Sequence, residues 1–357
     1  MDMEKNFHMK GGLGDTSYSM NSSLQKRVAD KVKHITLESI QEMYSKTAPE
    51  IVSIADLGCS SGPNTLSNIK DLVCAVEIAA GNMARPVPEF RVALNDLPTN
   101  DFNTIFQALP DLYRELKIGA GRSLCVYIGA YPGTFYGRLF PTKSLHFVYS
   151  SNSLHWLSKV PPGIYDKNGE TMNKGSLYIS VRSPPQVVQA YLKQFQEDFS
   201  LFLKSRSEEL MSGGRMVLVM LGRRGSSHAD RETSLLWELL YQSLVDLANQ
   251  GELEKEKVDR YEVHFYAPSK EELEDEIRKE GSFRVELMEA FEMGKDRANY
   301  GKVVTLTVRS IQESMLAHHF GETILDKLFE HYGRLIDEHL AKEDIKSISR
   351  VMVLTKL

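Results

Sequence analysis

The sequence predicts an α/β fold built on a twisted, mostly parallel sheet. Short apolar runs, each followed by a turn rich in Gly, Asn or Pro, alternate with long segments of helical periodicity. This alternation is typical of parallel sheets whose strands are buried on both faces. Because 357 residues exceed what a single hydrophobic core usually holds, we expect one main domain with a substantial appendage. This appendage would form part of the wall of a ligand site.

Six apolar runs are the expected strands of this sheet. They cover residues 51–57, 90–94, 124–128, 145–149, 215–221 and 351–354. Each run has the length of a strand and is too short for an ordinary helix. The last run would return the C-terminus to the sheet.

Helical segments with clear start and stop signals lie between and after these strands. A phenylalanine stripe at residues 195–202 has helical spacing and indicates a helix packed in the core. A leucine stripe follows an Asp230 cap. Ser269 and Glu272 form a capping box that opens a third helix, which Gly281 ends.

These signals divide the chain into a core and a cap. We place the core at residues 31–224, completed by strands within residues 300–310 and 348–357. Residues 225–347 read as a mainly helical substrate cap, and residues 1–30 are expected to close over the site.

Composition excludes several partners. The formal net charge is −5, which disfavours a nucleic-acid partner, and no apolar run reaches the ~20 residues that would span a bilayer. The segment after Met1 has no apolar core of a secretory signal, so we expect a cytoplasmic protein with no membrane partner. Cys59, Cys74 and Cys125 are odd in number and widely spaced, which predicts reduced thiols.

The first strand ends in a glycine-bearing turn that suits a ligand. In residues 54–64, Gly58 and Gly62 permit close backbone approach, and Asp56 can accept hydrogen bonds. Asp96 follows the second strand, where a carboxylate can accept both hydroxyls of a ribose. A tight strand-to-helix turn and a helix-capping Asp are the alternative explanations. The spacing lacks the GxGxxG pattern, which disfavours a nicotinamide oxidoreductase.

Two further segments look functional rather than structural. Residues 131–141 place aromatic side chains among turn residues, an arrangement suited to sandwiching an adenine ring. His155 lies beside Trp156, one of only two tryptophans. A lone His is more often structural, and a noncatalytic binding module remains an alternative at this point.

Several of these motifs, in this order, closely resemble the SABATH methyltransferases. The matching segments are residues 8–12, 17–22, 56–64, 95–98, 100–103, 132–141 and 155–158. Members of this plant family use S-adenosylmethionine (SAM) to methylate salicylate, benzoate, jasmonate and other small acids and, in one branch, xanthine nitrogens. The resemblance implies a Rossmann-like SAM-dependent methyltransferase sheet with a helical cap, and a homodimer.

The resemblance also implies which residues bind the cofactor. Thr134 stands where many relatives have Ser, so the hydroxyl is retained. The cofactor-binding residues expected from the motifs and the resemblance together are Tyr18, Ser22, Asp56, Gly58, Asn64, Asp96, Leu97, Thr134 and Phe135.

Gln25 and Trp156 match the pair that holds the substrate carboxylate in the acid-methylating members, and they are our expected catalytic residues. A carboxylic acid is already ionised at neutral pH, so the nucleophile needs no general base. Amide and indole N–H groups can orient its oxygen without neutralising it. The xanthine branch generally differs at Gln25, which makes an N-methyltransferase acting on xanthine-type or pyridine-type nitrogens the second choice.

The expected substrate pocket follows from the same resemblance. It comprises Gln25, Asn152, His155, Trp156, Leu221, Leu236, Trp237, Tyr266, Val308 and Ile311. His155 departs from the methionine typical of salicylate-preferring members, and Asn152 replaces an aromatic residue found in several of them. Both departures predict a roomier pocket without strict salicylate selectivity.

Some members of the family hold magnesium near matching positions. These positions are Asn173, Asp259, Tyr261 and Glu262. Glu262 stands where asparagine is usual, and although oxygen ligands suit magnesium, the reaction does not require a metal, which disfavours this site.

Overall fold

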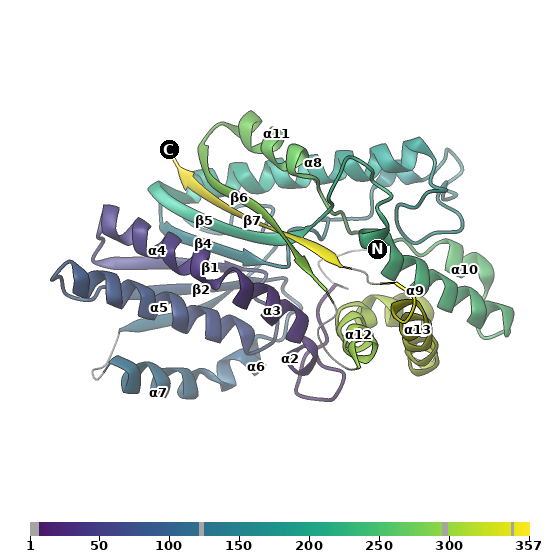
Figure 1. Cartoon of the computed structure of the whole chain (residues 1–357), viewed down its shortest axis with the longest axis horizontal. Helices are drawn as coiled ribbons and strands as arrows, with labels where there is room; N and C mark the ends of the chain where they lie inside the picture. The colour runs from purple at the N-terminus through teal and green to yellow at the C-terminus, as the bar shows by residue number, and fades with distance from the viewer. Residues whose placement is uncertain (1–6, 121–124, 295–298, 344–345) are drawn as a thin grey trace.

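The computed structural model describes residues 7–120, 125–294, 299–343 and 346–357 (Figure 1). Its centre is a seven-stranded sheet with the order β3-β2-β1-β4-β5-β7-β6. The strands are β1 (Ile51–Leu57), β2 (Glu89–Asp96), β3 (Val126–Pro132), β4 (Leu145–Ser151), β5 (Leu210–Gly222), β6 (Phe283–Met293) and β7 (Ser347–Lys356). Strands β1 to β5 pair in parallel, and β7 runs antiparallel to both of its neighbours. The mostly parallel α/β sheet is therefore confirmed.

Each of the six predicted strands is present. The predicted 124–128 run begins at Leu124, which lies outside the described residues, and β3 continues to Pro132. Within β1 every residue after Ile51 is buried, as expected for a central strand covered on both faces. Its apolar side chains alternate between two clusters, with Ile54 on one side of the sheet and Ala55 on the other.

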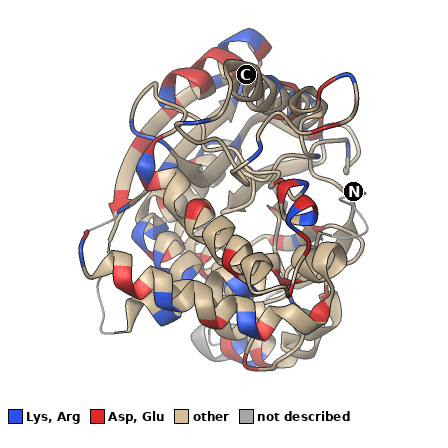
Figure 2. Cartoon of the chain, turned by 90° about the vertical axis from the view of Figure 1, so that its right-hand side faces the viewer, with Lys and Arg blue, Asp and Glu red and all other residues tan. Residues whose placement is uncertain are grey.

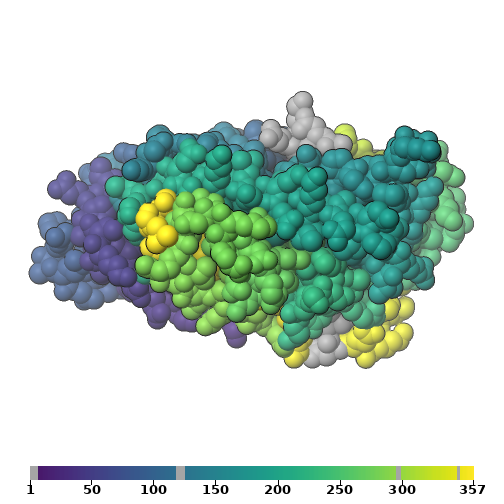
Figure 3. All heavy atoms as spheres, turned by 90° about the horizontal axis from the view of Figure 1, so that it is seen from above, coloured from purple at the N-terminus to yellow at the C-terminus, as the bar shows by residue number. Residues whose placement is uncertain are grey.

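Helices cover both faces of the sheet (Figure 1). One face packs against α4 (Lys33–Thr47), α5 (Asn64–Asn82) and α7 (Leu109–Ala120), and α6 (Phe102–Gln107) precedes α7. The other face packs against α8 (Pro185–Glu209) and α11 (Lys270–Glu280). Seen from above in Figure 3, the molecule is elongated, with the N-terminal half of the core at one end.

The remaining helices gather beyond the end of the sheet, at the right of Figure 1. They are α9 (Arg231–Asn249), α10 (Lys255–Asp259), α12 (Tyr300–Phe320) and α13 (Leu325–Leu340). The short helices α2 (Tyr18–Asn21) and α3 (Ser23–Lys31) lead into the core, and α2 lies beside α12. Figure 2 shows acidic and basic residues interspersed along the helices on this side of the molecule.

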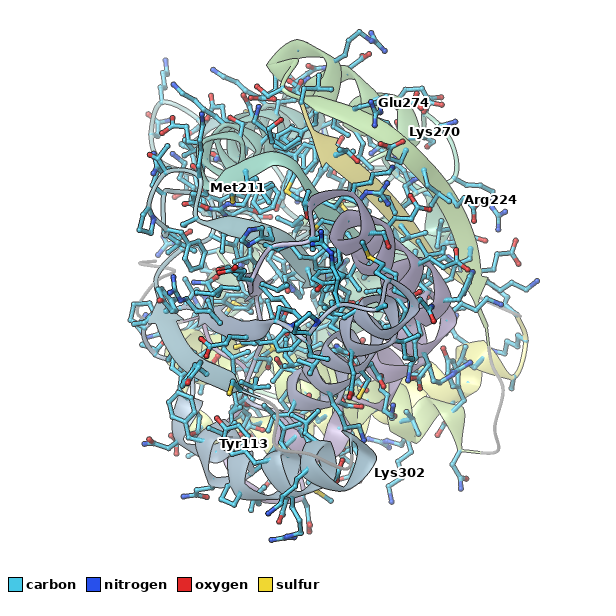
Figure 4. The ribbon with its side chains drawn as sticks, turned by 90° about the vertical axis from the view of Figure 1, so that its left-hand side faces the viewer. Tyr113, Met211, Arg224, Lys270, Glu274 and Lys302 are labelled. Carbon is cyan, nitrogen blue, oxygen red and sulfur yellow. The ribbon has the colours of Figure 1, made fainter. Side chains whose placement is uncertain are left out.

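The predicted helix signals match the observed boundaries. The Asp230 side chain caps α9 by accepting a hydrogen bond from the Glu232 N–H. Ser269 and Glu272 form the predicted capping box of α11, and Gly281 ends that helix in the left-handed conformation. Figure 4 shows Lys270 and Glu274 on the outer surface of α11, one helical turn apart.

Two assignments in the C-terminal half need correction. Residues 300–310 were expected to hold a strand, but they begin helix α12. This segment is rich in β-branched residues, and its helical spacing, which buries Val304 and Thr307, decides the outcome. The missing strand is β6, a largely exposed edge strand whose residues 283–287 alternate between apolar and charged side chains, a signal that the sequence analysis did not use. Because β6 belongs to the sheet and α11 packs on it, residues 225–347 contribute to the core as well as to the cap.

A buried ion pair holds the aromatic segment 132–141 against α8. Arg206 and Glu209 are fully buried, and their charged atoms lie 2.7 Å apart. The Arg206 guanidinium also donates to the carbonyls of Phe135 and Gly137, and Glu209 accepts from the backbone N–H groups of residues 139–140. Arg206 thus donates two hydrogen bonds, and Glu209 accepts two, at the segment that the sequence analysis assigned to adenine.

We predict that Glu209→Gln lowers the free energy of unfolding by about 3–5 kcal/mol, because it leaves the Arg206 charge buried without a partner. Urea denaturation would measure this loss. The neighbouring Glu208 supplies the matched control, since it pairs with Arg138 on the surface and Glu208→Gln should cost less than about 1 kcal/mol. Equal losses in both variants would contradict the role of the buried pair.

Candidate active site

A cavity of about 500 Å³ lies at the carboxyl ends of the parallel strands, where ligands of open α/β sheets bind. Its wall includes residues at the ends of β1, β2, β4 and β5. The cap helices α9, α12 and α13 and the N-terminal segment supply the rest of the wall. One enclosure therefore joins the sheet edge to the cap.

The loop after β1 forms the floor of the cavity at the sheet edge. Gly58 has a φ of +79°, and a Cβ on it would come within 2.1 Å of Ser153 Oγ, so only glycine fits. Ser60 also adopts a left-handed conformation. Its N–H donates to Asp96 Oδ2 at 2.8 Å, while Asp96 Oδ1 accepts from the Leu97 N–H at 2.8 Å. The Asp96 carboxylate thus fixes the loop in its strained shape.

Burial raises the pKa of two carboxyl groups at this edge. The pKa of Asp96 rises to about 6, and burial with the nearby charge of Asp96 raises the pKa of Asp56 to about 7. A hydrogen bond of 2.6 Å from Thr65 Oγ1 to Asp56 partly opposes the second shift. Burial and Asp96 also raise the pKa of Tyr18, so its hydroxyl keeps its proton. A ligand that donates hydrogen bonds or carries positive charge would relieve this cost.

The aromatic segment 132–141 is fixed from the sheet as well as from α8. Asn95, at the end of β2, donates its amide N–H groups to the carbonyls of Tyr131 and Gly133 at 2.7 and 2.9 Å. Phe135 and Thr134 line the cavity, and the Phe135 ring packs edge-to-face on a neighbouring tyrosine. A flat apolar face is thereby held next to the β1 loop.

Trp156 lies in a box of rings on the cap side. Its backbone bridges to Phe265, and its ring centroid lies 5.2 to 6.3 Å from those of Phe7, Trp237 and three other rings. No residue in the described segments accepts a hydrogen bond from its indole N–H. The donor is therefore available to a ligand.

The neighbouring His155 is buried and neutral. Burial lowers its pKa to about 3. Its Nδ1 accepts a hydrogen bond from the Leu221 N–H at 3.2 Å, which leaves the proton on Nε2. In this tautomer the imidazole can donate one hydrogen bond to a ligand, and its Nδ1 lone pair is already used.

The N-terminal segment crosses the cavity and joins the cap to the core. The Lys10 N–H donates to the Ser310 carbonyl of α12 at 2.9 Å, and Gly12 N–H donates to Asp101 near α6 at 2.9 Å. Gln25, on α3, lines the cavity, and its buried amide oxygen has no partner among the described residues. Its amide can therefore turn its N–H groups toward a ligand.

Most predicted site residues lie in the wall of this one cavity. They are Tyr18, Gln25, Gly58, Asp96, Leu97, Thr134, Phe135, Asn152, His155, Trp156, Leu221, Leu236, Trp237, Val308 and Ile311. Ser22 and Asn64 lie behind the wall, where Asn64 donates to Ser22 Oγ at 3.0 Å and ties α5 to the N-terminal segment. Asp56 also lies behind the wall, bound to Thr65.

Tyr266 is the predicted substrate residue that the cavity does not reach. It is completely buried, stacks on Phe195 and donates its hydroxyl to Glu272 at 3.0 Å. Glu272 also pairs with the buried Arg223. Tyr266 therefore helps to hold α11 against the cap, and the polar cluster around it keeps the ring away from the cavity.

Comparison with known proteins identifies the family. Residues 4–357 match the family of SAM dependent carboxyl methyltransferases. The chain is 46% identical to a probable jasmonic acid carboxyl methyltransferase 2 of Theobroma cacao and 43% identical to a salicylate carboxymethyltransferase of Clarkia breweri, with 99–100% of each chain covered. A solved structure of a loganic acid methyltransferase with SAH (S-adenosylhomocysteine) superimposes with a TM-score of 0.86 at 37% identity, covering 98% of both chains.

The chain belongs to the SAM-dependent carboxyl methyltransferases. The SABATH resemblance, the methyltransferase fold and the dependence on SAM are thereby confirmed, and a nicotinamide oxidoreductase is excluded. The relatives are named for methylating carboxylic acids, so the N-methyltransferase alternative is not favoured. No helix in the described part of the chain has the length and apolar character needed to cross a membrane.

The residues suggested for magnesium do not fit a metal. Asn173 directs its amide N–H toward Glu262 at 3.2 Å, and burial raises the pKa of Glu262 to about 8. The Tyr261 hydroxyl donates instead to Gln312, and Asp259 accepts from Tyr241. Asn173 and Glu262 bond to each other, while Tyr261 and Asp259 bond to residues outside this set, so we derive no step through a metal.

Several wall residues escaped the sequence analysis. Phe7, Ser60 and Gln312 are examples. Ser60 acts through its backbone, and the position of Phe7 depends on how the N-terminal segment crosses the cap. Gln312 could have been recognised from the sequence, because an amide within the apolar stripe of a helix usually has a specific hydrogen-bond partner.

We predict that affinity for SAH rises with pH from below the pKa of Asp96 to above that of Asp56 and then levels off. The bound ligand favours ionised carboxylates, so at a pH below these pKa values the carboxyl groups must lose protons when the ligand binds. Each such group lowers the affinity by up to about tenfold for each pH unit below its pKa. Calorimetry across this range would measure the effect. Asp96→Asn should weaken binding and flatten the profile, whereas a flat profile in the unaltered protein would contradict the prediction.

Proposed function

We propose that this enzyme converts a small plant carboxylic acid, of the benzoate, salicylate or jasmonate kind, into its methyl ester. SAM would bind at the sheet edge, and the acid would bind in the ring box under the cap. The observation that carries the proposal is that the wall of one cavity contains most residues of both predicted sets. Methyl transfer requires that the carboxylate oxygen and the methyl donor share one enclosure.

The cofactor would be held from three sides. Asp96 would accept hydrogen bonds from the ribose, Leu97 would contact the cofactor beside it, and Thr134 and Phe135 would cover the adenine. Tyr18 would close over the cofactor from the N-terminal segment, while Ser22, Asp56 and Asn64 would support this wall from behind. When bound, SAM supplies a methyl group on a positively charged sulfur, which is the electrophile of the reaction.

The protein's own task would be to aim an oxygen that is already anionic. Gln25 and Trp156 offer neutral N–H donors, which orient a carboxylate without neutralising it. His155 is neutral and its Nδ1 already accepts a hydrogen bond, so it would add a donor at Nε2 instead of acting as a base. A general base is unnecessary because the acid is ionised at neutral pH.

The size of the acid would be set by the cap. Leu236 and Trp237 of α9 and Val308 and Ile311 of α12 all line the cavity. Asn152 leaves room where several relatives carry a ring, which supports substrates larger than salicylate.

We propose in addition that the enzyme acts in the cytoplasm and that it is a homodimer. Light scattering of the purified chain would test the oligomeric state.

The first test is a panel of acids with labelled SAM. We expect methyl esters from one or more of benzoate, salicylate, jasmonate, loganate, nicotinate and indole-3-acetate, identified by product mass. Xanthine and its methylated derivatives should yield no product. Methylation of ring nitrogens without any ester would overturn the proposal.

The second test concerns the carboxylate donor. Trp156→Phe keeps the ring but deletes the N–H, so kcat should fall roughly tenfold to a hundredfold while SAH affinity remains unchanged. Steady-state kinetics and calorimetry would measure both. The matched variant Trp237→Phe should act mainly on KM, because we assign Trp237 to the wall only. An unchanged kcat in Trp156→Phe would refute the donor role.

A further inference from the structure

One amide in the cavity wall has an N–H donor without a hydrogen-bond partner among the residues that the structure describes. Gln312 lies on α12, on the same face as Val308 and Ile311, and is completely buried. Its Nε2 makes no hydrogen bond to any residue that the structure describes. A buried donor without an acceptor is costly, so a partner is expected from outside the chain.

The orientation of this amide follows from Tyr261. The Tyr261 hydroxyl donates to Gln312 Oε1 at 3.2 Å, and burial raises the pKa of Tyr261, so the proton stays on the oxygen. Turning the amide over would leave Oε1 without a donor and the hydroxyl proton without an acceptor. The observed orientation therefore leaves one group unsatisfied instead of two, and that group is the Nε2 donor.

The surroundings of Gln312 are apolar and fixed. Phe7 and Met9 of the N-terminal segment line the same cavity, and the Ser314 hydroxyl holds this segment to α12 by donating to the His8 carbonyl at 2.7 Å. The lining contains one Lys or Arg among the described residues, Arg27, whose guanidinium donates to a backbone carbonyl. A second anionic group on the substrate would have no countercharge here, which favours a neutral acceptor.

We propose that Gln312 selects acids that carry a neutral hydrogen-bond acceptor, such as a ketone oxygen, away from the carboxyl group that is methylated. This inference rests on the proposed function and deepens it by naming the substrate class. Gln25 and Trp156 bind the carboxylate of the acid, and Gln312 binds the acceptor at its other end. The amide donates to the substrate oxygen, and Tyr261 is a positioning residue that keeps the amide turned toward it.

The test compares matched acids in matched variants. The substrates are jasmonate and a series of linear keto acids that differ only in the position of the ketone, each paired with the acid that lacks this oxygen. The proteins are the unaltered chain, Gln312→Leu and Tyr261→Phe. For each pair, kcat/KM is measured with saturating SAM, and thermal unfolding and SAH affinity report whether each variant is folded.

The unaltered enzyme should prefer at least one keto acid over its partner by about tenfold or more. Gln312→Leu should remove this preference, because kcat/KM should fall for the keto acid and change little for the partner acid. Tyr261→Phe should reduce the preference in part. A preference that survives in Gln312→Leu, or its absence in the unaltered enzyme, would overturn the inference. If both acids of every pair are esterified equally, the proposed function still stands, whereas no ester from any acid would defeat the function itself.

Discussion

Burial of ionisable groups governs this active site. At the sheet edge it raises the pKa of Asp56 and Asp96, and under the cap it keeps His155 neutral. Each of these groups is held by hydrogen bonds to backbone or hydroxyl groups, with no ion pair. In the proposed reaction, a positively charged sulfur and a carboxylate held in such a cavity would attract each other more strongly than in water. The fold would then contribute an enclosure that orients the reactants, without a general acid or base.

That enclosure is assembled from segments far apart in the sequence. Parallel strands bring the loops after β1, β2, β4 and β5 to one edge, as the topology requires. The Arg206–Glu209 pair then fixes the aromatic segment against α8. The N-terminal segment closes the remaining side by bonding to both α12 and Asp101. Core, cap and N-terminal segment are thus each needed before the cavity has a complete wall.

The features that the sequence predicted well are those encoded by neighbouring residues. The Asp230 cap, the Ser269 capping box and the buried strand β1 depend on local patterns, and the structure has each where expected. Strand β6 and helix α12 depend on distant contacts, since β6 is defined by pairing with β7 and α12 by packing against α13. The site has the same limit, because local motifs at the strand ends could be predicted from the sequence, whereas the contact between Gln312 and Tyr261 joins distant segments and could not.

The cofactor part and the acid part of the proposed site differ in the same way. The residues assigned to the cofactor lie mainly on loops of the rigid sheet, whose conformation is fixed by glycine at position 58 and by the Asp96 carboxylate. Four of the residues assigned to the acid lie on the cap helices, namely Leu236 and Trp237 on α9 and Val308 and Ile311 on α12. Changes on these helices alter the shape and polarity of the acid site without disturbing the strand ends. A family built this way can keep one methyl-transfer geometry while varying its acids, and an unpartnered amide on α12 is one form that such variation takes.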